Sequence, residues 1–599
     1  MSKRRRLAIL RKSLIIFFSA ITCYYFFYLK IYLSIKKTTW FDDHEFISYN
    51  LLREEPIDLN QTCYIPRYHP FDHTIIKFVK HVKPISCRNI QSPLTFVDDK
   101  SILRFNDSAF DHSFLSKRLV KCTYSEVLRD NSSPSEDTFK LNTSKPFYGQ
   151  SDVSHADFIQ VECKLFLVIN VYNNIHINIR DIPHKKFTQE EIHQKYNVLL
   201  YGIDSVSRLN AMRQLPKTLK YLKDILKVFV FRGYHKVGDN TFPNLATILT
   251  GSQPHRKPNN LLPVEGEMKP YDPWPFLWKN FSAEGYRTMF AEDWPEWNIF
   301  NHAGGGFKDQ PTDHYARTYW KAVETTSINS FSSSYCVGSQ TKHSSQINYV
   351  ARLIKKLYGK IPFWAFSFLA EVSHDYITGQ RIDTIRRTLL GSIEDNMPLF
   401  TIHLPERFRK SQPRAVRNLK TNVMRLTSPY DTYCTIIDIL KLSIDKSHVT
   451  GRIKTYHGIS MFGEIPRNRN CDDAGIELSY CTCNNEIQIS LQEPYVRPAS
   501  LFLVETINKM LLNKYGNYDS CARLSLKNII EARIIHTEEI ISKMVKIVLE
   551  TSPGDGVLEG VVQIFDHDKH ELIGNIERIN RYGDQSICIK DKQLRAFCY

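Results

Sequence analysis

The sequence lacks several features that would assign it to common protein classes. Its 599 residues contain no internal repeat, no long low-complexity tract and no nucleic-acid-binding motif, and no Cys-x2-Cys pairs recur with zinc-finger spacing. The formal net charge is +16, but the basic residues are scattered and form no long patch. These absences exclude a zinc finger and argue against nucleic acid as a partner. The charge either favours anionic ligands, such as glycans, sulfates, phosphates or lipid headgroups, or reflects a solvated basic surface.

One apolar run near the N-terminus suggests a membrane span. Residues 13–29 are apolar and aromatic-rich, follow a basic cluster and are closed by Lys30. This is at the short end of the roughly 17–25 residues that cross a bilayer as a helix, and snorkelling of the Lys30 stem extends the span to Leu33. No small-x-small site follows, which disfavours the alternative of a cleaved signal peptide. We therefore expect a transmembrane signal anchor at 13–33 that contacts the lipid bilayer and a cytoplasmic tail at 1–12.

Two further patterns place the rest of the chain in an oxidising, glycosylating compartment, namely the ER or Golgi lumen or the cell surface. Five Asn-x-Ser/Thr sequences predict glycosylation on the luminal side: Asn60, Asn106, Asn131, Asn142 and Asn280. Cys23 lies in the apolar run, and the other twelve cysteines are an even number available for disulfides. Cys481 and Cys483 are too close together for a usual zinc clip, so we expect them in a disulfide knot whose pairing stays open.

Changes in sequence character divide the luminal part into three regions. Residues 34–195 are irregular, with strand-like runs at 165–169 and 176–179, and predict a glycosylated stem with a disulfide-containing β-rich region. In residues 196–510, apolar strand-like runs alternate with helical stretches, which predicts an α/β domain with a mostly parallel sheet flanked by helices. Residues 511–599 predict a small C-terminal appendage with disulfides.

Candidate site residues follow the predicted strands, because ligands of such sheets bind at the carboxyl ends of the strands. Asp204 ends the run 197–203, and a buried carboxylate there requires a compensating partner such as a metal ion. Thr241 lies between a strand and a helix. Beside a metal its hydroxyl would be a nucleophile, whereas the local sequence alone favours a helix N-cap. Another strand ends at Glu292-Asp293, and the aromatic strand from Phe363 ends at Glu371-Val372-Ser373-His374-Asp375. A histidine between two carboxylates at a strand end suits a metal ligand, whereas a lone histidine there is more often structural.

The order of these motifs resembles the alkaline phosphatase/sulfatase superfamily. The matching stretches are Tyr-Gly-Ile-Asp-Ser-Val-Ser-Arg at 201–208, Val-Gly-Asp-Asn-Thr-Phe-Pro-Asn at 237–244, Leu-Thr-Gly at 249–251 and Ser-His-Asp at 373–375. Within the superfamily, the chain is most similar to the domain-of-unknown-function 229 (DUF229) branch of animal membrane-anchored proteins, through 422–431, 457–476 and 579–583. The resemblance extends from about residue 196 to the C-terminus, and it implies an alkaline-phosphatase-like fold.

The resemblance also implies a site with two divalent metals, with zinc expected, that hydrolyses a phosphate or sulfate ester. Asp204 and Thr241 would bind one metal, and Thr241 would be the nucleophile. The other implied roles are His374 as a ligand of the second metal with Glu371 or Asp375, His457 as a late histidine ligand, and Asn244 and Glu292 as pocket lining. Sulfatases use a Cys/Ser-x-Pro-x-Arg motif, and Thr241 here lacks that arginine, so phosphoester chemistry is preferred.

The most diagnostic metal motif of the superfamily, Asp-His-Gly, is absent from the sequence. Where the family pattern has a helix and a strand before this motif, residues 376–378 lead directly into Gly379. Three residues, at about 3.3 Å each, are too short to replace them. Either the chain is a splice form or gene model that lacks an exon, or the protein has lost the motif. We therefore predict little or no hydrolase activity; the alternative is a non-catalytic luminal protein that binds an anionic glycan or lipid on a hydrolase scaffold.

Overall fold

The structure is a computed structural model that describes most of the chain after residue 60. The described ranges are 61–79, 83–88, 90–111, 115, 117–133, 135–147, 149–184, 187–252, 268–373, 383–386, 388–445, 451–483, 486–515, 521–535, 542–565, 569–580 and 592–598. The predicted anchor at 13–33 and the glycosylation candidate Asn60 lie outside these ranges. Within them, no helix is both long enough and apolar enough to cross a membrane.

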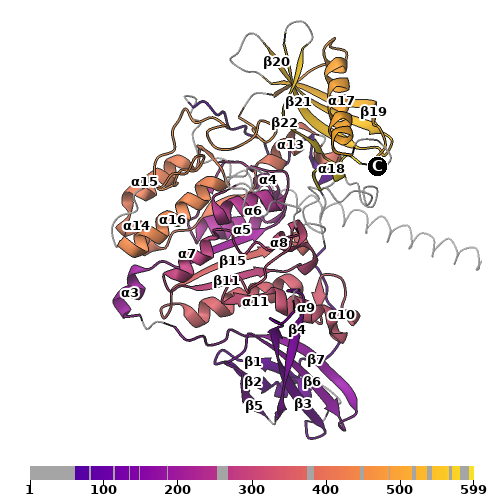
Figure 1. The fold of residues 1–599 in the computed structure, drawn as a ribbon. Coiled ribbons are helices and arrows are strands. Elements are labelled where there is room, and N and C mark those ends of the chain that lie inside the picture. Colours follow the sequence, from indigo (N-terminus) through magenta and orange to yellow (C-terminus); the bar gives the residue numbers. More distant parts are fainter. Residues whose placement is uncertain are drawn as a thin grey trace, which may run out of the picture.

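A parallel sheet forms the centre of the described structure (Figure 1). Its four described strands are ordered β12 (His314–Tyr315), β11 (Arg287–Glu292), β15 (Phe363–Leu369) and β8 (Val198–Ile203), and every neighbouring pair is parallel. All residues of β15 are buried, as expected for a strand that is covered on both faces. The predicted α/β domain with a parallel sheet is therefore confirmed.

Helices cover both faces of this sheet. On one face, the aromatic side chains of β15 pack with α6 (Thr241–Thr250), α7 (Leu277–Ala283) and α16 (Pro429–Asp445). On the other face, β11 and β15 pack with α9 (Arg317–Thr325) and α11 (Lys342–Leu357). Shorter elements around the sheet are α4 (Arg208–Gln214), α5 (Pro216–Asp224), β9 (Phe229–Phe231), β10 (Gly233–Tyr234), α8 (Ile299–Ala303), α12 (Asp383–Arg386), α13 (Leu389–Asn396), β16 (Phe400–Ile402), α14 (Glu406–Ser411), α15 (Pro413–Asn422) and β17 (Leu426–Thr427).

Strand β8 lies at one edge of the sheet as described, and it is unusually exposed. Leu199 and Tyr201 are 41% and 42% exposed, whereas Ala365 and Ser367, their register partners in β15, are fully buried. Register partners point to the same face of a sheet. The face that α9 and α11 cover at β11 and β15 is therefore partly open at β8.

Antiparallel sheets flank the centre at opposite ends of the molecule (Figure 1). The N-terminal region forms one sheet of β4 (Phe139–Phe147), β3 (Val120–Arg129), β6 (Phe158–Leu165) and β7 (Ile169–Ile177), and a second of β1 (Thr95–Val97), β2 (Ile102–Phe105) and β5 (Gln150–Asp152). The C-terminal sheet consists of β18 (Glu486–Gln488), β19 (Ser525–Ile535), β20 (Lys543–Ser552), β21 (Val557–Ile564) and β22 (His570–Arg578), and α17 (Val496–Tyr515) packs on it.

The strand predicted at 165–169 is wrong. Leu165 ends β6 and Ile169 begins β7, and the three residues between them form a turn. An apolar run predicts a strand by composition, but Phe166 and Leu167 have positive φ angles of 52° and 67°, which no strand accommodates. The run at 176–179 is only partly in a strand, because β7 ends at Ile177.

Five disulfides cross-link the described residues. The pairs are Cys63–Cys483, Cys87–Cys336, Cys122–Cys163, Cys471–Cys481 and Cys521–Cys598. Cys434 is a buried thiol, and Cys23 and Cys588 lie outside the described residues. The predicted oxidation of the cysteines is therefore confirmed, including the participation of Cys481 and Cys483 in a knot.

Candidate functional site

The carboxyl edge of the central sheet brings together residues that are far apart in the sequence. Asp204 follows β8, Asp293 follows β11 and Glu371 lies just after β15. The backbone N–H of Asp204 donates to the carbonyl of Leu369 at 2.8 Å. Oδ1 of Asp293 accepts from the backbone N–H groups of Ala370 and Glu371 at 2.7 and 3.3 Å. Three carboxylates therefore lie along one sheet edge.

Thr241 lies directly against the first of these carboxylates. Its Oγ1 donates a hydrogen bond to Oδ1 of Asp204 at 3.0 Å. Thr241 is the first residue of helix α6, and the N-cap is Asn240, whose side-chain oxygen accepts from the N–H of Phe242 at 3.0 Å. The helix-cap role that the local sequence favoured for Thr241 is therefore wrong, because the preceding asparagine takes it. The Thr241 hydroxyl is left to contact Asp204 at a helix N-terminus, where partial positive charge accumulates.

Asn244 supports the loop that carries Thr241. Its Nδ2 donates to the carbonyls of Gly238 and Asn240, both at 2.7 Å, and its Oδ1 accepts from the N–H of Val237 at 2.7 Å. These three bonds engage both polar atoms of the amide with backbone. The structure therefore places Asn244 as a brace behind the loop, one turn of helix beyond the threonine.

Salt bridges also stabilise the loop that precedes α6. Nζ of Lys236 lies 2.6 Å from Oδ2 of Asp395, and Nη2 of Arg386 lies 2.9 Å from the same oxygen and 3.1 Å from Oδ1 of Asp239. The two cations and two carboxylates alternate, so each charge has an opposite neighbour. Sequence reasoning missed this cluster, because its members come from the loop before α6, from α12 and from α13 and share no local pattern.

Two adjacent carboxylates at the end of β11 are buried. Glu292 is 3% exposed and Asp293 is fully buried. Burial raises the pKa of Glu292 to about 8, and the charges of Asp293 and Glu136 act in the same direction. Burial also raises the pKa of Asp293 to about 6, with a contribution from the charge of Glu371. Among the described residues, Oε2 of Glu292 and Oδ2 of Asp293 have no hydrogen-bond partner, which makes both of them candidates for binding a proton or a cation.

Asp293 is the residue that sequence reasoning passed over at this position. Glu292 accepts a hydrogen bond from the backbone N–H of Ile299 at 3.0 Å, which ties it to the start of α8. Asp293, by contrast, bridges the ends of β11 and β15 next to Glu371. The Glu-Asp pair at a strand end was the available signal, but only the register of the strands shows which of the two lies beside Glu371.

The remaining predicted residues differ in their placement. Nζ of Lys342, at the start of α11, lies 2.6 Å from Oε1 of Glu371. The ring of His457 packs against Tyr430, with 5.2 Å between ring centroids, and its carbonyl accepts from Arg469 at 2.5 Å. These contacts put His457 at the N-terminal end of α16. His374 and Asp375 lie outside the described residues.

The fit of a metal to this edge is incomplete. Asp204 and Thr241 are two adjacent oxygen ligands, and a metal usually needs at least four in total. In the described part of the chain, Cys471, Cys481 and Cys483 are the only group of three or more His, Cys, Asp or Glu residues whose ligand atoms all lie within 4.8 Å of one another. The described residues do not by themselves complete the metal site that the resemblance implied.

A protein-family model matches the chain on both sides of residues 378–380. The model of a family described as a protein of unknown function (DUF229) matches residues 80–380 and 378–530. The chain belongs to the DUF229 family. The two matched segments of DUF229 meet at 378–380, where Gly379 follows residues 376–378 without an Asp-His-Gly motif. Neither a curated protein nor a solved structure matches the chain.

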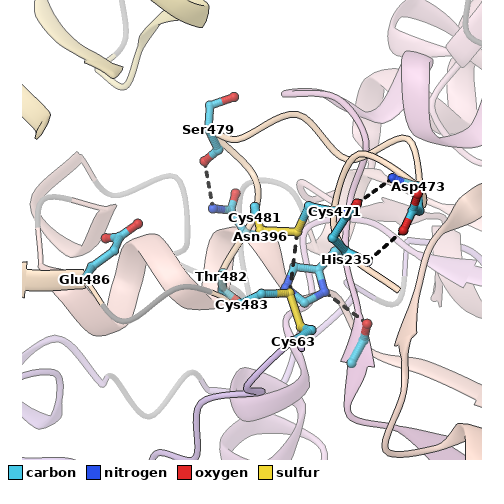
Figure 2. The surroundings of a disulfide bond; sticks show 12 residues. Cys63, His235, Asn396, Cys471, Asp473, Ser479, Cys481, Thr482, Cys483 and Glu486 are labelled. Atoms are coloured by element: carbon cyan, nitrogen blue, oxygen red, sulfur yellow. Dashed lines mark hydrogen bonds between the residues drawn. A yellow bond between two sulfur atoms is a disulfide. The ribbon is translucent and has the colours of Figure 1, made fainter. Parts of the chain in front are cut away.

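The cysteine cluster of this DUF229 chain is a pair of disulfides (Figure 2). Cys63–Cys483 and Cys471–Cys481 lie side by side, with 3.5 Å between the sulfurs of Cys471 and Cys483. Thiolates bind metals, and sulfurs that are already bonded to each other do not supply them. His235 lies beside this pair, with its Nε2 2.6 Å from Oγ1 of Thr482. The cluster is therefore structural, and it links the segment around Cys63 covalently to the segment around Cys483.

Proposed function

We propose that this DUF229 protein is a membrane-anchored luminal or extracellular protein with an alkaline-phosphatase-like head from a phospho- or sulfoester hydrolase family, and that its hydrolase activity is impaired. The observation that carries the proposal is the 3.0 Å contact between the Thr241 hydroxyl and Asp204 at the carboxyl edge of a parallel sheet. A hydroxyl beside a carboxylate at a helix N-terminus is the arrangement of an activated nucleophile. Divalent metal, with zinc expected, would clamp the ester oxygens there when bound.

Placement of the head outside the cytoplasm is part of the proposal. The apolar run at 13–33 would anchor the chain, with its basic N-terminus in the cytoplasm. The disulfides support an oxidising compartment. The glycosylation candidates Asn131, Asn142 and Asn280 are exposed, and Asn106 is partly exposed, so a glycosyltransferase would reach them.

Three observations support impairment. The described residues around Asp204 and Thr241 do not complete a metal site. The family match breaks at 378–380, where the sequence lacks the Asp-His-Gly motif. Leu199 and Tyr201 of β8 are about two-fifths exposed on a face that helices cover elsewhere. An additional helix and strand after β15 would supply both the missing ligands and the missing cover, because strands of a parallel sheet are normally buried on both faces.

The test compares the chain as it stands with one that carries the DUF229 segment inserted between Thr378 and Gly379. Bound divalent metal is measured by elemental analysis, and turnover is measured on aryl phosphate, phosphodiester and sulfate esters. We expect the natural chain to bind substoichiometric metal and to match its Thr241→Ala variant in turnover. We expect the chain with the insertion to gain metal and a turnover that Thr241→Ala abolishes. Full metal occupancy with turnover that depends on Thr241 in the natural chain would refute the impairment.

A second candidate function is non-catalytic binding of an anionic glycan or lipid. A cavity of about 300 Å³ lies between α4, α5, α15 and β9. It is lined by Arg208, Met212, Leu219, Lys223, Val228, Phe229, Val230, Arg232, Leu399, Lys420 and Val423. This mixture of basic and apolar side chains suits an amphiphilic anion. Saturable binding of dodecyl phosphate to the full chain that Lys420→Glu weakens would support this function, and binding that is insensitive to the substitution would exclude this cavity.

A further inference from the structure

The turn between β6 and β7 exposes a continuous apolar surface. The exposed fractions are 62%, 63%, 80% and 57% for Phe166, Leu167, Val168 and Ile169. Leu119, directly before β3 and beside this turn, is 44% exposed. Single exposed apolar residues are common, but four in succession at the end of a hairpin are not. We refer to these five residues as the apolar tip.

The conformation of the apolar tip is one that its residues do not favour. The N–H of Val168 donates to the carbonyl of Leu165 at 3.2 Å, which closes a β-turn within the three-residue loop between β6 and β7. Both central residues, Phe166 and Leu167, have positive φ angles of 52° and 67°. Turns of this kind are dominated by Asn-Gly and similar pairs, because bulky side chains are strained there. Large apolar residues at strained and exposed positions indicate that something other than turn formation selects them.

The hairpin beneath the apolar tip is rigid. Cys122 and Cys163 are register partners in β3 and β6 and form a disulfide that is fully buried. Two positions further along, Val120 pairs with Leu165, and the N–H of Phe166 donates to the carbonyl of Leu119 at 3.2 Å. The apolar tip is therefore held in a fixed shape at the end of a sheet, so little conformational freedom is lost when it contacts a partner.

Basic residues surround the apolar tip. Lys121 and Lys164 are register partners on neighbouring strands, and both are exposed. Arg118 is exposed immediately before Leu119. Lys117 is exposed and forms a surface pair with Asp107. We refer to these four basic residues as the basic collar. At the surface of a bilayer, apolar groups enter the acyl boundary and cations contact lipid phosphates, so the apolar tip and the basic collar suit this interface.

We propose that the apolar tip inserts into the surface of the lipid bilayer that carries the chain. This inference rests on the proposed membrane anchor, which would keep the head at high effective concentration near the bilayer. The chain from Leu33 to Gln61 has roughly 28 peptide units of at most about 3.6 Å each, so its greatest possible length is about 100 Å. The apolar tip then provides a second, reversible contact that orients the head on the membrane.

The test places a fluorophore on the tip of the full chain reconstituted in phosphatidylcholine vesicles with and without phosphatidylserine. The label is attached at Ile169→Cys, with Ile225→Cys as the matched control, because Ile225 is 61% exposed on the head. The parent chain, carried through the same labelling, gives the background from native cysteines. Flotation with the vesicles reports the anchor independently. Quenching by lipid-borne doxyl groups should be roughly twofold or more stronger at Ile169→Cys than at Ile225→Cys, because an inserted tip lies about 5–10 Å deep.

A second variant separates insertion from folding. Phe166→Asn with Leu167→Gly installs the residues that this turn prefers, so the fold should be retained and the lipid quenching at Ile169→Cys should fall to the control level. The basic collar predicts stronger quenching with phosphatidylserine than without it. Flotation with equal lipid quenching at the two sites would overturn the proposal. Lipid quenching at Ile169→Cys that Phe166→Asn with Leu167→Gly leaves unchanged would also overturn it, because the apolar tip would then not make the contact.

Discussion

The disulfide between Cys63 and Cys483 allows a quantitative test of the described architecture. It closes a loop of 420 residues and joins the first described segment of the chain to the pair of disulfides that includes Cys471–Cys481. Cys87–Cys336 and Cys471–Cys481 already close 249 and 10 of these residues, which leaves 161 to be constrained by Cys63–Cys483. Cys471–Cys481, next to it, closes only 10 residues. The two bridges lie in the same environment but differ widely in loop length, so one serves as a control for the other.

The chain-entropy relation gives the expected magnitudes. Removing a bridge around 161 residues should cost about 5 kcal/mol of folding free energy, and removing one around 10 residues about 3 kcal/mol. The entropy of unfolding is about 2.1 cal/mol/K per residue, so a domain of about 315 residues, the length of 196–510, loses about 1.5 °C of melting temperature per kcal/mol. On this scale, Cys63→Ala with Cys483→Ala should lower the melting temperature by roughly 8 °C and Cys471→Ala with Cys481→Ala by roughly 4 °C.

The single substitution Cys63→Ala has a different expected outcome. It leaves the thiol of Cys483 3.5 Å from the sulfur of Cys471, which is bonded to Cys481. The Cys483 thiolate would attack Cys471, form Cys471–Cys483 and release the thiolate of Cys481, so the number of disulfides is conserved. Peptide mapping without reduction should therefore find both pairings in Cys63→Ala. Melting curves are recorded at one scan rate for all variants. Equal melting temperatures for the parent and the Cys63→Ala/Cys483→Ala chain, or a single pairing in Cys63→Ala, would refute the reasoning.

Three further predictions concern a buried carboxylate, a buried ion pair and a helix cap. Because burial raises the pKa of Glu292 to about 8 from its ordinary 4.5, the stability contributed by its protonated form is complete below pH 4.5 and is lost as the pH rises towards 8. The loss is at most about 1.4 kcal/mol per pH unit, so Glu292→Gln should flatten the fall in melting temperature between pH 5 and 8, and an unchanged slope would contradict the burial argument. Arg469 makes a bidentate contact with Asp431 at 2.9 and 3.0 Å, and both residues are buried. Arg469→Met should cost about 3–5 kcal/mol, whereas Arg469→Met with Asp431→Asn should recover part of it in urea titrations. Asn240→Ala removes the N-cap of α6 and should cost about 0.5–2 kcal/mol; a loss below this range would return the capping role to Thr241.

Several features of the site were readable from the sequence because they depend on local composition. The continuous apolar run of β15 predicts a strand that is buried on both faces, and the structure buries all of it. The positions of Asp204, Glu292 and Glu371 after apolar runs predict that they reach one sheet edge. The even number of luminal cysteines predicted oxidation, and ten of these twelve cysteines pair.

Other features depend on contacts between distant residues, and only the tertiary structure decides them. Cys63 pairs with Cys483 across 420 residues because packing brings them together, and no spacing rule selects that partner. Asn240 takes the helix cap and leaves the Thr241 hydroxyl to Asp204, because the loop geometry, not the residue type, determines which side chain faces the first N–H groups. The apolar run from Leu165 to Ile169 turns back on itself because β6 and β7 pair over their whole length. Sequence patterns specify which residues favour burial and which local structures they favour, whereas packing over long separations selects the partners.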